Sequence, residues 1–286
     1  MKTEGVINYT GNKSKLIEPL NDLFKHSKAD RLVDCCAGGL SVTLHSTFNR
    51  VLANDISPVL TSMYAHMYEL GPDLTIKIIN NMIARNGLGK EKIYTMPYMN
   101  FRDVTNTLIS RTGIRDTIVL ERLLVLQYHS FSNIMRFNSE GYFNAPFGQR
   151  SYNKSSERKL KEFFDIMSRK FVEFSRKSYL DLDIKDNDLV YIDPPYLITE
   201  AVYNAGWNQE SDIKMMEWLD ELNERGVEFV MSNVTHHRGK TNDRLIEWAK
   251  KYNVHSNEHK YVFNSYQAKD MSEETIEVMI TNIDKD

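Results

Sequence analysis

The chain has 286 residues, a formal net charge of −3, 41% hydrophobic residues and 26% charged residues. These proportions are typical of a folded protein and exclude a disordered one, and the length allows one large domain or a core with an inserted module. Apolar runs such as Ile118–Leu120 are too short to cross a bilayer. The first residues lack the apolar stretch of a secretory signal. We therefore expect neither secretion nor a membrane partner.

The only two cysteines, Cys35 and Cys36, are adjacent in the sequence. Neighbouring cysteines rarely form a disulfide, and two thiols alone cannot build a zinc site. We expect free thiols in a reducing cytoplasm, either of a bacterial cell or of the host of a phage that encodes the chain. Four histidines could suggest a metal site, namely His129, His236, His237 and His255. Their spacing does not match the patterns of metal ligands, so we expect no metal.

The N-terminal part predicts alternating helices and strands. The first predicted element is a helix with the apolar face Leu16, Leu20, Leu23 and Phe24, which Pro19 would disturb unless it lies in an opening turn. A buried strand at Arg31–Cys36, a helix from about Ser41, a strand at Val51–Asp55 and a helix start at Ser57-Pro58 follow. A strand–helix–strand–helix order favours a parallel sheet.

From about Tyr68 to Phe164 the pattern becomes helical. It predicts helices at Asp73–Arg85, Asp116–His129 and Glu157–Phe174, which are interrupted by the polar, aromatic-containing loop Gly141–Gly148. No strand is predicted to alternate with these helices. We therefore expect residues 68–164 to be an insert into an α/β core formed by residues 1–67 and 165–286.

The α/β pattern then resumes. It predicts strands at Leu189–Ile192, Val227–Met231, Lys260–Tyr266 and Thr275–Thr281, and helices at Asp212–Arg225 and Asn242–Tyr252. The last two strands have little sequence between them and should pair antiparallel. The expected fold is a doubly wound, mostly parallel α/β sheet of the Rossmann-like kind with a mainly helical insert.

Two turns could bind a cofactor. Leu32–Val42 runs from a strand through a Gly-Gly turn into a helix, where backbone N–H groups can approach a ligand, although a plain connecting turn is equally compatible. Asp55 follows the next strand and could bind ribose hydroxyls or cap a helix. Tyr9–Lys13 combines an aromatic ring, a glycine and a lysine, which suit an adenine ring and a carboxylate but also an ordinary surface turn.

The sequence Asp-Pro-Pro-Tyr at Asp193–Tyr196 is the most specific catalytic signal. It follows a buried strand, and open α/β sheets bind ligands at the carboxyl ends of their strands. An exocyclic amine has its lone pair delocalised into the ring and two hydrogens that need acceptors. The Asp193 carboxylate and the Pro194 carbonyl could accept them, Pro195 stiffens the turn, and Tyr196 could stack on the base.

The segment Phe131–Arg150 interleaves aromatic residues, amides and arginines. From Gln127 to Lys161 there are six Lys or Arg residues against two acids, so this stretch could face phosphates. Arginine and amide side chains can also read base edges in the major groove. A solvated loop with some buried aromatic rings is the alternative interpretation.

Along the chain the order is Tyr9–Lys13, the glycine turn, the segment Phe131–Arg150 and then Asp193–Tyr196. With these four segments in this order, the chain resembles the Dam family of DNA adenine methyltransferases, and in particular its T-even bacteriophage type. The resemblance includes His129–Asn133, Pro146–Arg150, Asp193–Thr199, Ser232–Val234 and Lys250–Val254. It implies transfer of a methyl group from S-adenosylmethionine to N6 of adenine in duplex DNA, which leaves S-adenosylhomocysteine. It implies no metal and no obligate protein partner.

The resemblance also implies site residues. Those implied for the cofactor are Tyr9, Thr10, Gly11, Lys13, Asp34, Cys36, Gly38, Asp55, Ile56 and Asp193. Phe131 should wedge into the duplex while the target adenine flips out. Residues at positions that read GATC in the family are Ser132, Arg136, Asn138, Pro146 and Arg150. The glycine turn departs from the usual F-x-G-x-G form, because Cys36-Ala37-Gly38 stands at its start, and we expect this to change how the cofactor packs.

Three alternative functions remain open. Cytosine N4 and a protein glutamine amide are also planar amines that would suit an Asp-Pro-Pro-Tyr turn. The Dam-like insert disfavours cytosine, and its aromatic and basic residues disfavour a protein substrate. A non-catalytic DNA-binding regulator would be expected to have lost the catalytic turn, whereas Asp193–Tyr196 is intact.

Overall fold

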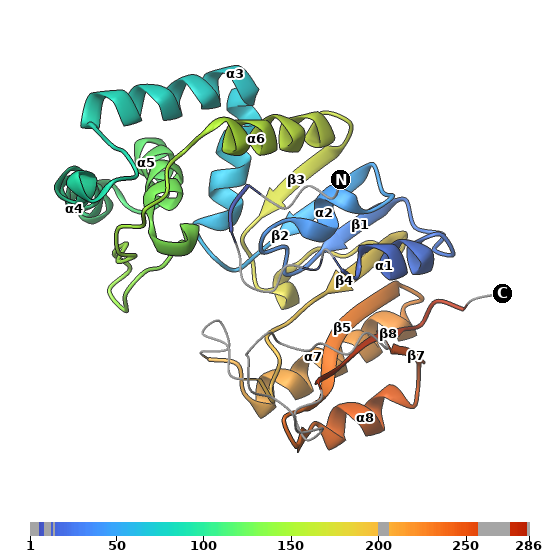
Figure 1. The fold of residues 1–286 in the computed structure, drawn as a ribbon. Coiled ribbons are helices and arrows are strands. Elements are labelled where there is room, and N and C mark those ends of the chain that lie inside the picture. Colours follow the sequence, from blue (N-terminus) through green and yellow to red (C-terminus); the bar gives the residue numbers. More distant parts are fainter. Residues whose placement is uncertain (1–5, 9–12, 14, 200–205, 257–274, 285–286) are drawn as a thin grey trace. The chain divides into compact units, whose positions relative to one another are not determined.

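The computed structural model describes residues 6–8, 13, 15–199, 206–256 and 275–284 (Figure 1). Contacts between Cα atoms divide the chain into two compact units. The first unit comprises Met1–Glu18 and Ala37–Ser178, and the second unit comprises Pro19–Cys36 and Tyr179–Asp286. The predicted recognition insert at residues 68–164 falls within the first unit, but its proposed boundaries stay a prediction.

The second unit contains the sheet that carries the Asp-Pro-Pro-Tyr sequence. In the order in which they lie side by side, its strands are β1 (Arg31–Asp34), β4 (Asp188–Ile192), β5 (Glu228–His237), β8 (Thr275–Thr281) and β7 (Asn253–Ser256). β1, β4 and β5 are parallel, whereas β8 runs antiparallel to both β5 and β7. The short β6 (Lys240–Thr241) pairs with the end of β5. All of β4 is buried, as expected of a parallel strand covered on both faces.

Helices α7 (Gln209–Glu224) and α8 (Asp243–Ala249) pack against β5 (Figure 1). α7 begins at a capping box, in which the Asn208 side chain accepts a hydrogen bond from the Ser211 N–H at 3.0 Å. A short 3-10 turn, η3 (Tyr179–Asp181), opens the second long segment of this unit. These helices and parallel strands confirm the expected mixed α/β fold.

The first unit pairs β2 (Arg50–Asn54) with β3 (Phe171–Ser175) in parallel. Its helices are α2 (Ser41–His45), α3 (Leu60–Asn86), α4 (Thr95–Thr112), α5 (Thr117–His129) and α6 (Lys154–Met167), with 3-10 turns η1 (Lys92–Tyr94) and η2 (Phe131–Asn133). The helices share one hydrophobic core, in which Tyr64 packs on Phe163 with 5.8 Å between ring centres. α3 bends at Gly71, where φ is 74° and Pro72 follows.

The first predicted helix is confirmed as α1 (Ile17–Phe24). Pro19 lies in its opening turn, where the missing N–H would have no helical partner in any case. The whole predicted apolar face is buried, namely Leu16, Leu20, Leu23 and Phe24. Among the described residues, no helix has a long enough apolar stretch to cross a membrane.

Two predicted helices extend too far. The helix predicted at Glu157–Phe174 ends at Met167, and Phe171–Ser175 form β3 instead. There Val172 is buried while both its neighbours are exposed, which is the alternation of a strand. The helix predicted at Asn242–Tyr252 ends at Ala249, and Asn253–Ser256 form β7.

Helix α4 is a further difference from the prediction. The sequence does not predict this helix, because its polar and apolar residues follow no clear helical period. The buried residues of α4 are Tyr98, Phe101 and Thr105, and the helix packs against α5. The predicted strand at Lys260–Tyr266 lies outside the described residues. The strand predicted at Thr275–Thr281 is confirmed as β8.

Candidate functional site

The Asp-Pro-Pro-Tyr turn directly follows the buried strand β4. Asp193 is therefore at the carboxyl end of a parallel strand, with Pro194 buried behind it. The Tyr196 carbonyl accepts hydrogen bonds from both the backbone N–H and the hydroxyl of Thr199, each at 3.1 Å. The prolines and this closed turn hold the Asp193 carboxylate in a fixed place, as a group that must meet a substrate requires.

Tyr196 lies between two carboxylates. Its hydroxyl is 2.8 Å from Asp193 Oδ1 and 2.9 Å from Glu277 Oε1, which is on β8. Burial raises the pKa of the Tyr196 phenol well above its ordinary value, and the charges of Asp193 and Glu277 raise the pKa further. Tyr196 is therefore a neutral phenol that can act as a hydrogen-bond donor at this site.

Other polar groups of the second unit lie on β4 and β5 and at the end of β1. The Tyr191 hydroxyl lies 2.9 Å from the Ser232 hydroxyl, where either oxygen could be the donor. Asp34, at the end of β1, is buried. Burial, and after it the charge of Asp193, raises the pKa of Tyr191 well above its ordinary value. Cys36 is half-buried and is not part of a disulfide. Glu277 was not among the predicted site residues, because a single acid in the apolar strand Thr275–Thr281 has no recognisable motif.

The glycine turn and Asp55 are joined in the first unit. Gly38 has φ 45°, and its N–H donates to Asp55 Oδ2 at 2.8 Å, while the Ser57 N–H donates to Asp55 Oδ1 at 2.8 Å. Burial raises the pKa of Asp55, and these two hydrogen bonds act in the opposite direction. A carboxylate has about four lone-pair positions, so two backbone donors leave room for a ligand. Asp55 thus holds the glycine turn and the turn that follows β2, but it does not cap α3, whose N-cap residue is Val59, so the helix-cap interpretation is wrong. Its carboxylate still has capacity for ribose hydroxyls.

The remaining predicted cofactor residues are only partly described. Lys13 is half-buried, and its carbonyl accepts from the Leu16 N–H at 2.8 Å, so the backbone leads directly into α1. Ile56 is 76% exposed although it follows the buried Asp55, which leaves an apolar surface beside that carboxylate. The predicted contacts of Tyr9, Thr10 and Gly11 lie outside the described residues.

The predicted wedge residue Phe131 is 61% exposed at the start of η2. Ser132 and Asn133 follow it with φ values of 54° and 55°, which is a left-handed conformation that costs energy for residues other than glycine. The chain holds them there, because the Phe131 N–H donates to Pro146 O at 2.8 Å and the Asn8 side chain donates to Ser132 O at 2.8 Å. The turn that carries Phe131 therefore includes a strained backbone, and the Phe131 ring is exposed to solvent there.

The predicted base-reading residues form part of the same loop. The Arg136 guanidinium donates through Nε to Asn144 Oδ1 at 2.9 Å and through Nη2 to Asn144 O at 2.8 Å. The Asn138 side chain accepts from the N–H groups of Glu140 and Tyr142 at 3.1 Å and 2.8 Å. All five predicted base-reading residues are exposed, and the side chains of Arg136 and Asn138 also form hydrogen bonds within the loop.

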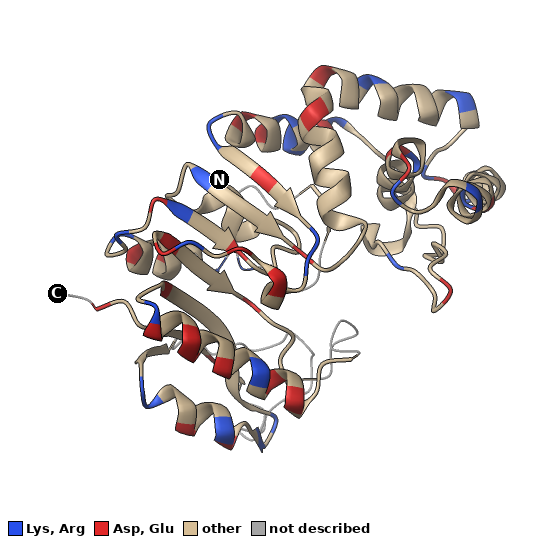
Figure 2. Cartoon of the chain, turned by 180° about the vertical axis from the view of Figure 1, so that it is seen from behind, with Lys and Arg blue, Asp and Glu red and all other residues tan. Residues whose placement is uncertain are grey.

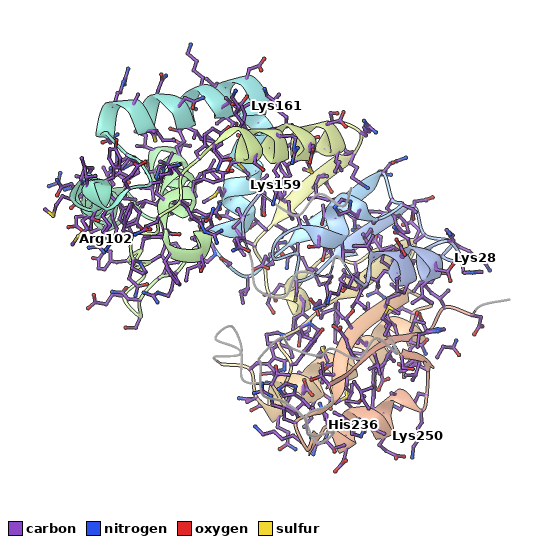
Figure 3. The ribbon with its side chains drawn as sticks, viewed as in Figure 1. Lys28, Arg102, Lys159, Lys161, His236 and Lys250 are labelled. Atoms are coloured by element: carbon purple, nitrogen blue, oxygen red, sulfur yellow. The ribbon has the colours of Figure 1, made fainter. Side chains whose placement is uncertain are left out.

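A groove of about 710 Å³ adjoins this loop within the first unit. Its lining includes the cationic side chains of Lys90, Arg150 and Lys159, together with amide and hydroxyl groups from the start of α6. Figure 3 shows Lys159 and Lys161 on α6. Lys161 Nζ lies 2.6 Å from Glu157 Oε1 and does not line the groove, whereas Lys159 does.

The described residues offer no evident metal centre. Among them, no three His, Cys, Asp or Glu side chains gather closely enough to hold a metal ion. The expectation of a metal-free reaction stays a prediction.

An α/β fold with a fixed Asp-Pro-Pro-Tyr turn after a buried parallel strand defines the class as a methyltransferase that acts on amines. The sequence model of the D12 class N6 adenine-specific DNA methyltransferases matches residues 9–263. The chain belongs to this family.

Several named proteins are similar to the chain. Type II methyltransferase M.FokI of Planomicrobium okeanokoites is 34% identical over 96% of this chain, and modification methylase StsI of Streptococcus sanguinis is 30% identical over 96%. The chain spans only 42% of the length of each of these two relatives. The DNA adenine methylase of Escherichia coli K12 is 27% identical, and the match covers 81% of both chains.

Proposed function

We propose that this chain transfers the methyl group of S-adenosylmethionine to N6 of adenine in duplex DNA. The observation that carries the proposal is the place of Asp193, which is fixed at the carboxyl end of the buried strand β4 and held by the Tyr196 hydroxyl at 2.8 Å. Membership of the N6 adenine-specific family supports the nature of the substrate.

The chemistry follows from the needs of an aromatic amine. Its nitrogen lone pair is delocalised, so the nitrogen becomes nucleophilic only when acceptors draw both N–H hydrogens out of the ring plane. Asp193 Oδ2 and the Pro194 carbonyl would accept these hydrogens, and a fixed arrangement lowers the barrier without reorganisation during the reaction. We further propose that the Tyr196 ring stacks on the adenine.

The residues present fit an adenosine-type cofactor. S-adenosylmethionine, when bound, supplies an electrophilic methyl group on its sulfur. In the first unit the Asp55 carboxylate suits the ribose hydroxyls, and the exposed Ile56 suits an adenine face. We assign Tyr9, Lys13, Asp34 and Gly38 to the same cofactor on the family resemblance.

The proposed DNA surface lies in the first unit and includes the insert at residues 68–164. An exposed Phe131 on a strained turn suits a side chain that fills the gap left by a flipped base. The cationic lining of the groove beside it suits phosphates. α7 of the second unit carries several acids and one lysine (Figure 2), so this helix is not suited to phosphate contact.

We propose GATC as the target site, which is the site implied by the resemblance to the T-even phage type. Ser132, Pro146 and Arg150 are exposed and could meet base edges, whereas Arg136 would have to give up its bonds to Asn144 to do so. M.FokI and StsI are named as a type II methyltransferase and a modification methylase, which favours a role in DNA modification. Such a reaction would take place in the cytoplasm.

Methylation of defined duplexes tests the proposal. The purified chain would be incubated with S-adenosylmethionine and a plasmid, and every methylated base would then be mapped by sequencing. We expect N6-methyladenine, confined to GATC. N4-methylcytosine would overturn the choice of base, methylation of adenine at another site would overturn GATC alone, and no methylation would favour the non-catalytic DNA-binding alternative.

A further inference from the structure

We propose that Glu277 is a positioning residue of the methyl-transfer site that carries a proton in the active protein. In this arrangement the Glu277 carboxylic acid donates to the Tyr196 hydroxyl, and the Tyr196 hydroxyl donates to Asp193 Oδ1. Asp193 Oδ2 is then the oxygen that meets the target amine. The inference rests on the function proposed above, and it adds a residue from a different strand to the site.

Glu277 is within hydrogen-bond distance of the catalytic turn. It is on β8 opposite Val234 of β5, and it is 9% exposed. The Tyr196 hydroxyl is 2.9 Å from Glu277 Oε1 and 2.8 Å from Asp193 Oδ1, and both distances are in the range of O–H···O hydrogen bonds. The three groups therefore form one chain, although 81 residues separate Tyr196 from Glu277.

The number of hydrogens limits which of these three groups can be ionised. A phenol has one hydrogen, and ionised carboxylates are acceptors only. If both Asp193 and Glu277 were ionised, one of the two short contacts would be a contact between two acceptors. Two negative charges facing one buried hydroxyl would also repel each other. One carboxyl group must therefore be protonated for both contacts to be hydrogen bonds.

The role of Asp193 decides where the proton lies. Asp193 is proposed to accept a hydrogen bond from the amine N–H, so it must be the ionised member. The phenol cannot be the ionised member, because burial raises the pKa of Tyr196 well above its ordinary value and the charge of Asp193 raises it further. The proton therefore belongs to Glu277.

The three linked groups hold one another in place. With the hydroxyl of Tyr196 held from both sides, the tyrosine ring cannot turn about its side-chain bonds without breaking two hydrogen bonds. The same chain fixes Asp193, because one of its oxygens is already in use. Besides Glu277, the titratable groups on the strands paired with β8 are Glu228, His236 and His237 of β5 and His255 of β7. Those around the Tyr196 phenol are Asp34, Tyr191 and Asp193.

Two substitutions at one position separate the alternatives. In Glu277→Gln the side-chain amide keeps the shape and can still donate to the Tyr196 hydroxyl, as a protonated acid does. Glu277→Ala removes the donor. We expect kcat to fall about tenfold or more for E277A and less than about threefold for E277Q, with little change in KM for DNA in either. Glu247→Gln, at an exposed position on α8, is the matched control.

The pH profile gives a readout that a change in packing alone would not move. Wild-type kcat should fall as pH rises and Glu277 loses its proton, whereas E277Q, which has no such proton to lose, should lack that fall. In a Tyr196→Phe background, which removes the hydroxyl, E277Q and E277A should have equal kcat values. If E277Q is as impaired as E277A, or keeps the wild-type pH profile, the proposal is wrong.

A spectroscopic measurement keeps this outcome distinct from failure of the proposed function. In infrared difference spectra of wild type against E277Q, we expect the C=O stretch of a protonated carboxylic acid in the wild type at neutral pH. Its absence would overturn the protonation of Glu277 even in a protein that methylates adenine. Its presence in a protein that methylates nothing would leave the proton in place and reject only the function.

Discussion

Gly148 lies so close to Phe131 that a Cβ atom added to Gly148 would be 2.6 Å from the Phe131 backbone nitrogen, and closer still to the Ser130 carbonyl oxygen. The Gly148 N–H also donates to His129 O at 2.8 Å. These contacts join the segment from Pro146 to Gly148 to the turn that carries Phe131. The exposed ring is thus placed by backbone contacts that permit no side chain at position 148.

Gly148→Ala should therefore act on DNA binding through Phe131. The new Cβ meets rigid backbone, so the loop must shift, and we expect stability to decrease by about 1–3 kcal/mol, which is the usual scale of overpacking. DNA affinity should fall and cofactor affinity should not. Thermal unfolding and separate titrations with DNA and S-adenosylmethionine measure the three effects. Gly87→Ala, where nothing lies within 4 Å but φ is also positive, is a control for backbone strain without a clash.

Phe131→Ala should impair base flipping more than binding. With 2-aminopurine in place of the target adenine, wild type should give a rise in fluorescence as the base leaves the stack. The variant should give a smaller or slower rise, because nothing fills the gap. Phe171, which is 60% exposed on β3, offers a matched control as Phe171→Ala. An unchanged fluorescence response in the Phe131 variant would remove the wedge role.

Much of the site could be predicted because its signals are local. A continuous apolar strand followed by Asp193 predicts both β4 and the place of the turn, and the structure has both. A glycine turn after one strand and an acid after the next likewise single out Gly38 and Asp55. The sequence does not predict that the Gly38 N–H donates a hydrogen bond to Asp55. Short-range patterns of this kind involve few residues that are close in the sequence, so they can be recognised without knowledge of the tertiary structure.

The features that could not be predicted depend on distant partners. Glu277 gains its role from Tyr196, and no spacing in the sequence connects β8 with the turn after β4. The resemblance implies that Arg136 reads a base, but only the structure shows that its hydrogen bonds go to Asn144 of the same loop. β3 could not be predicted because five residues after a long amphipathic helix carry too short a pattern to separate strand from helix.

Asp55→Ala should weaken S-adenosylmethionine binding by about 1.5–3 kcal/mol, which is the scale of a hydrogen bond to a charged group. Calorimetric titration measures this change, and Asp103→Ala, at an exposed position of the same unit, is the control. If Asp55 only caps the turn, the variant should lose about 1 kcal/mol of stability and keep its cofactor affinity. That result would reject the ribose role.

The pKa of Asp55 adds a test by pH. Burial raises this pKa in the folded protein, so the protonated form is favoured there. The stability from this group is present below the unfolded pKa and is lost as pH rises through the higher folded pKa. The free energy of unfolding of wild type should therefore decrease relative to that of Asp55→Asn over this window. Chemical unfolding at several acidic pH values measures it, and a constant difference would contradict the raised pKa.

Asp193→Ala should abolish methyl transfer while DNA binding persists, because the carboxylate is assigned to the reacting amine and not to sequence reading. We expect kcat to fall at least about a hundredfold, which corresponds to roughly 2.7 kcal/mol. Single-turnover methylation and a separate DNA titration measure the two properties. Asp186→Ala, at an exposed position before the same strand, should behave as wild type. Activity within about tenfold of wild type would reject the assignment of Asp193.

Arg136→Ala should cost about 1–3 kcal/mol on GATC and relax discrimination at one base pair if this residue reads a base. The structure supports a competing role, in which Arg136 holds Asn144 and shapes the loop. Methylation rates on GATC and on each single-base variant of it separate the two. A decrease that is equal on every site would support the structural role and reject base reading.

Lys159→Ala should weaken binding to all sequences alike, because Lys159 lines the cationic groove and binding to phosphates carries no sequence information. Removing one cation that binds a phosphate should lower the slope of log affinity against log salt by about one unit. Lys161→Ala is the matched control from the same helix, since Lys161 is bound to Glu157 at 2.6 Å and does not line the groove. DNA titrations at several salt concentrations, on GATC and on an unrelated duplex, give both slopes. An unchanged slope for Lys159→Ala, or an equal decrease for both lysines, would show that the groove does not single out Lys159 as a phosphate-binding residue.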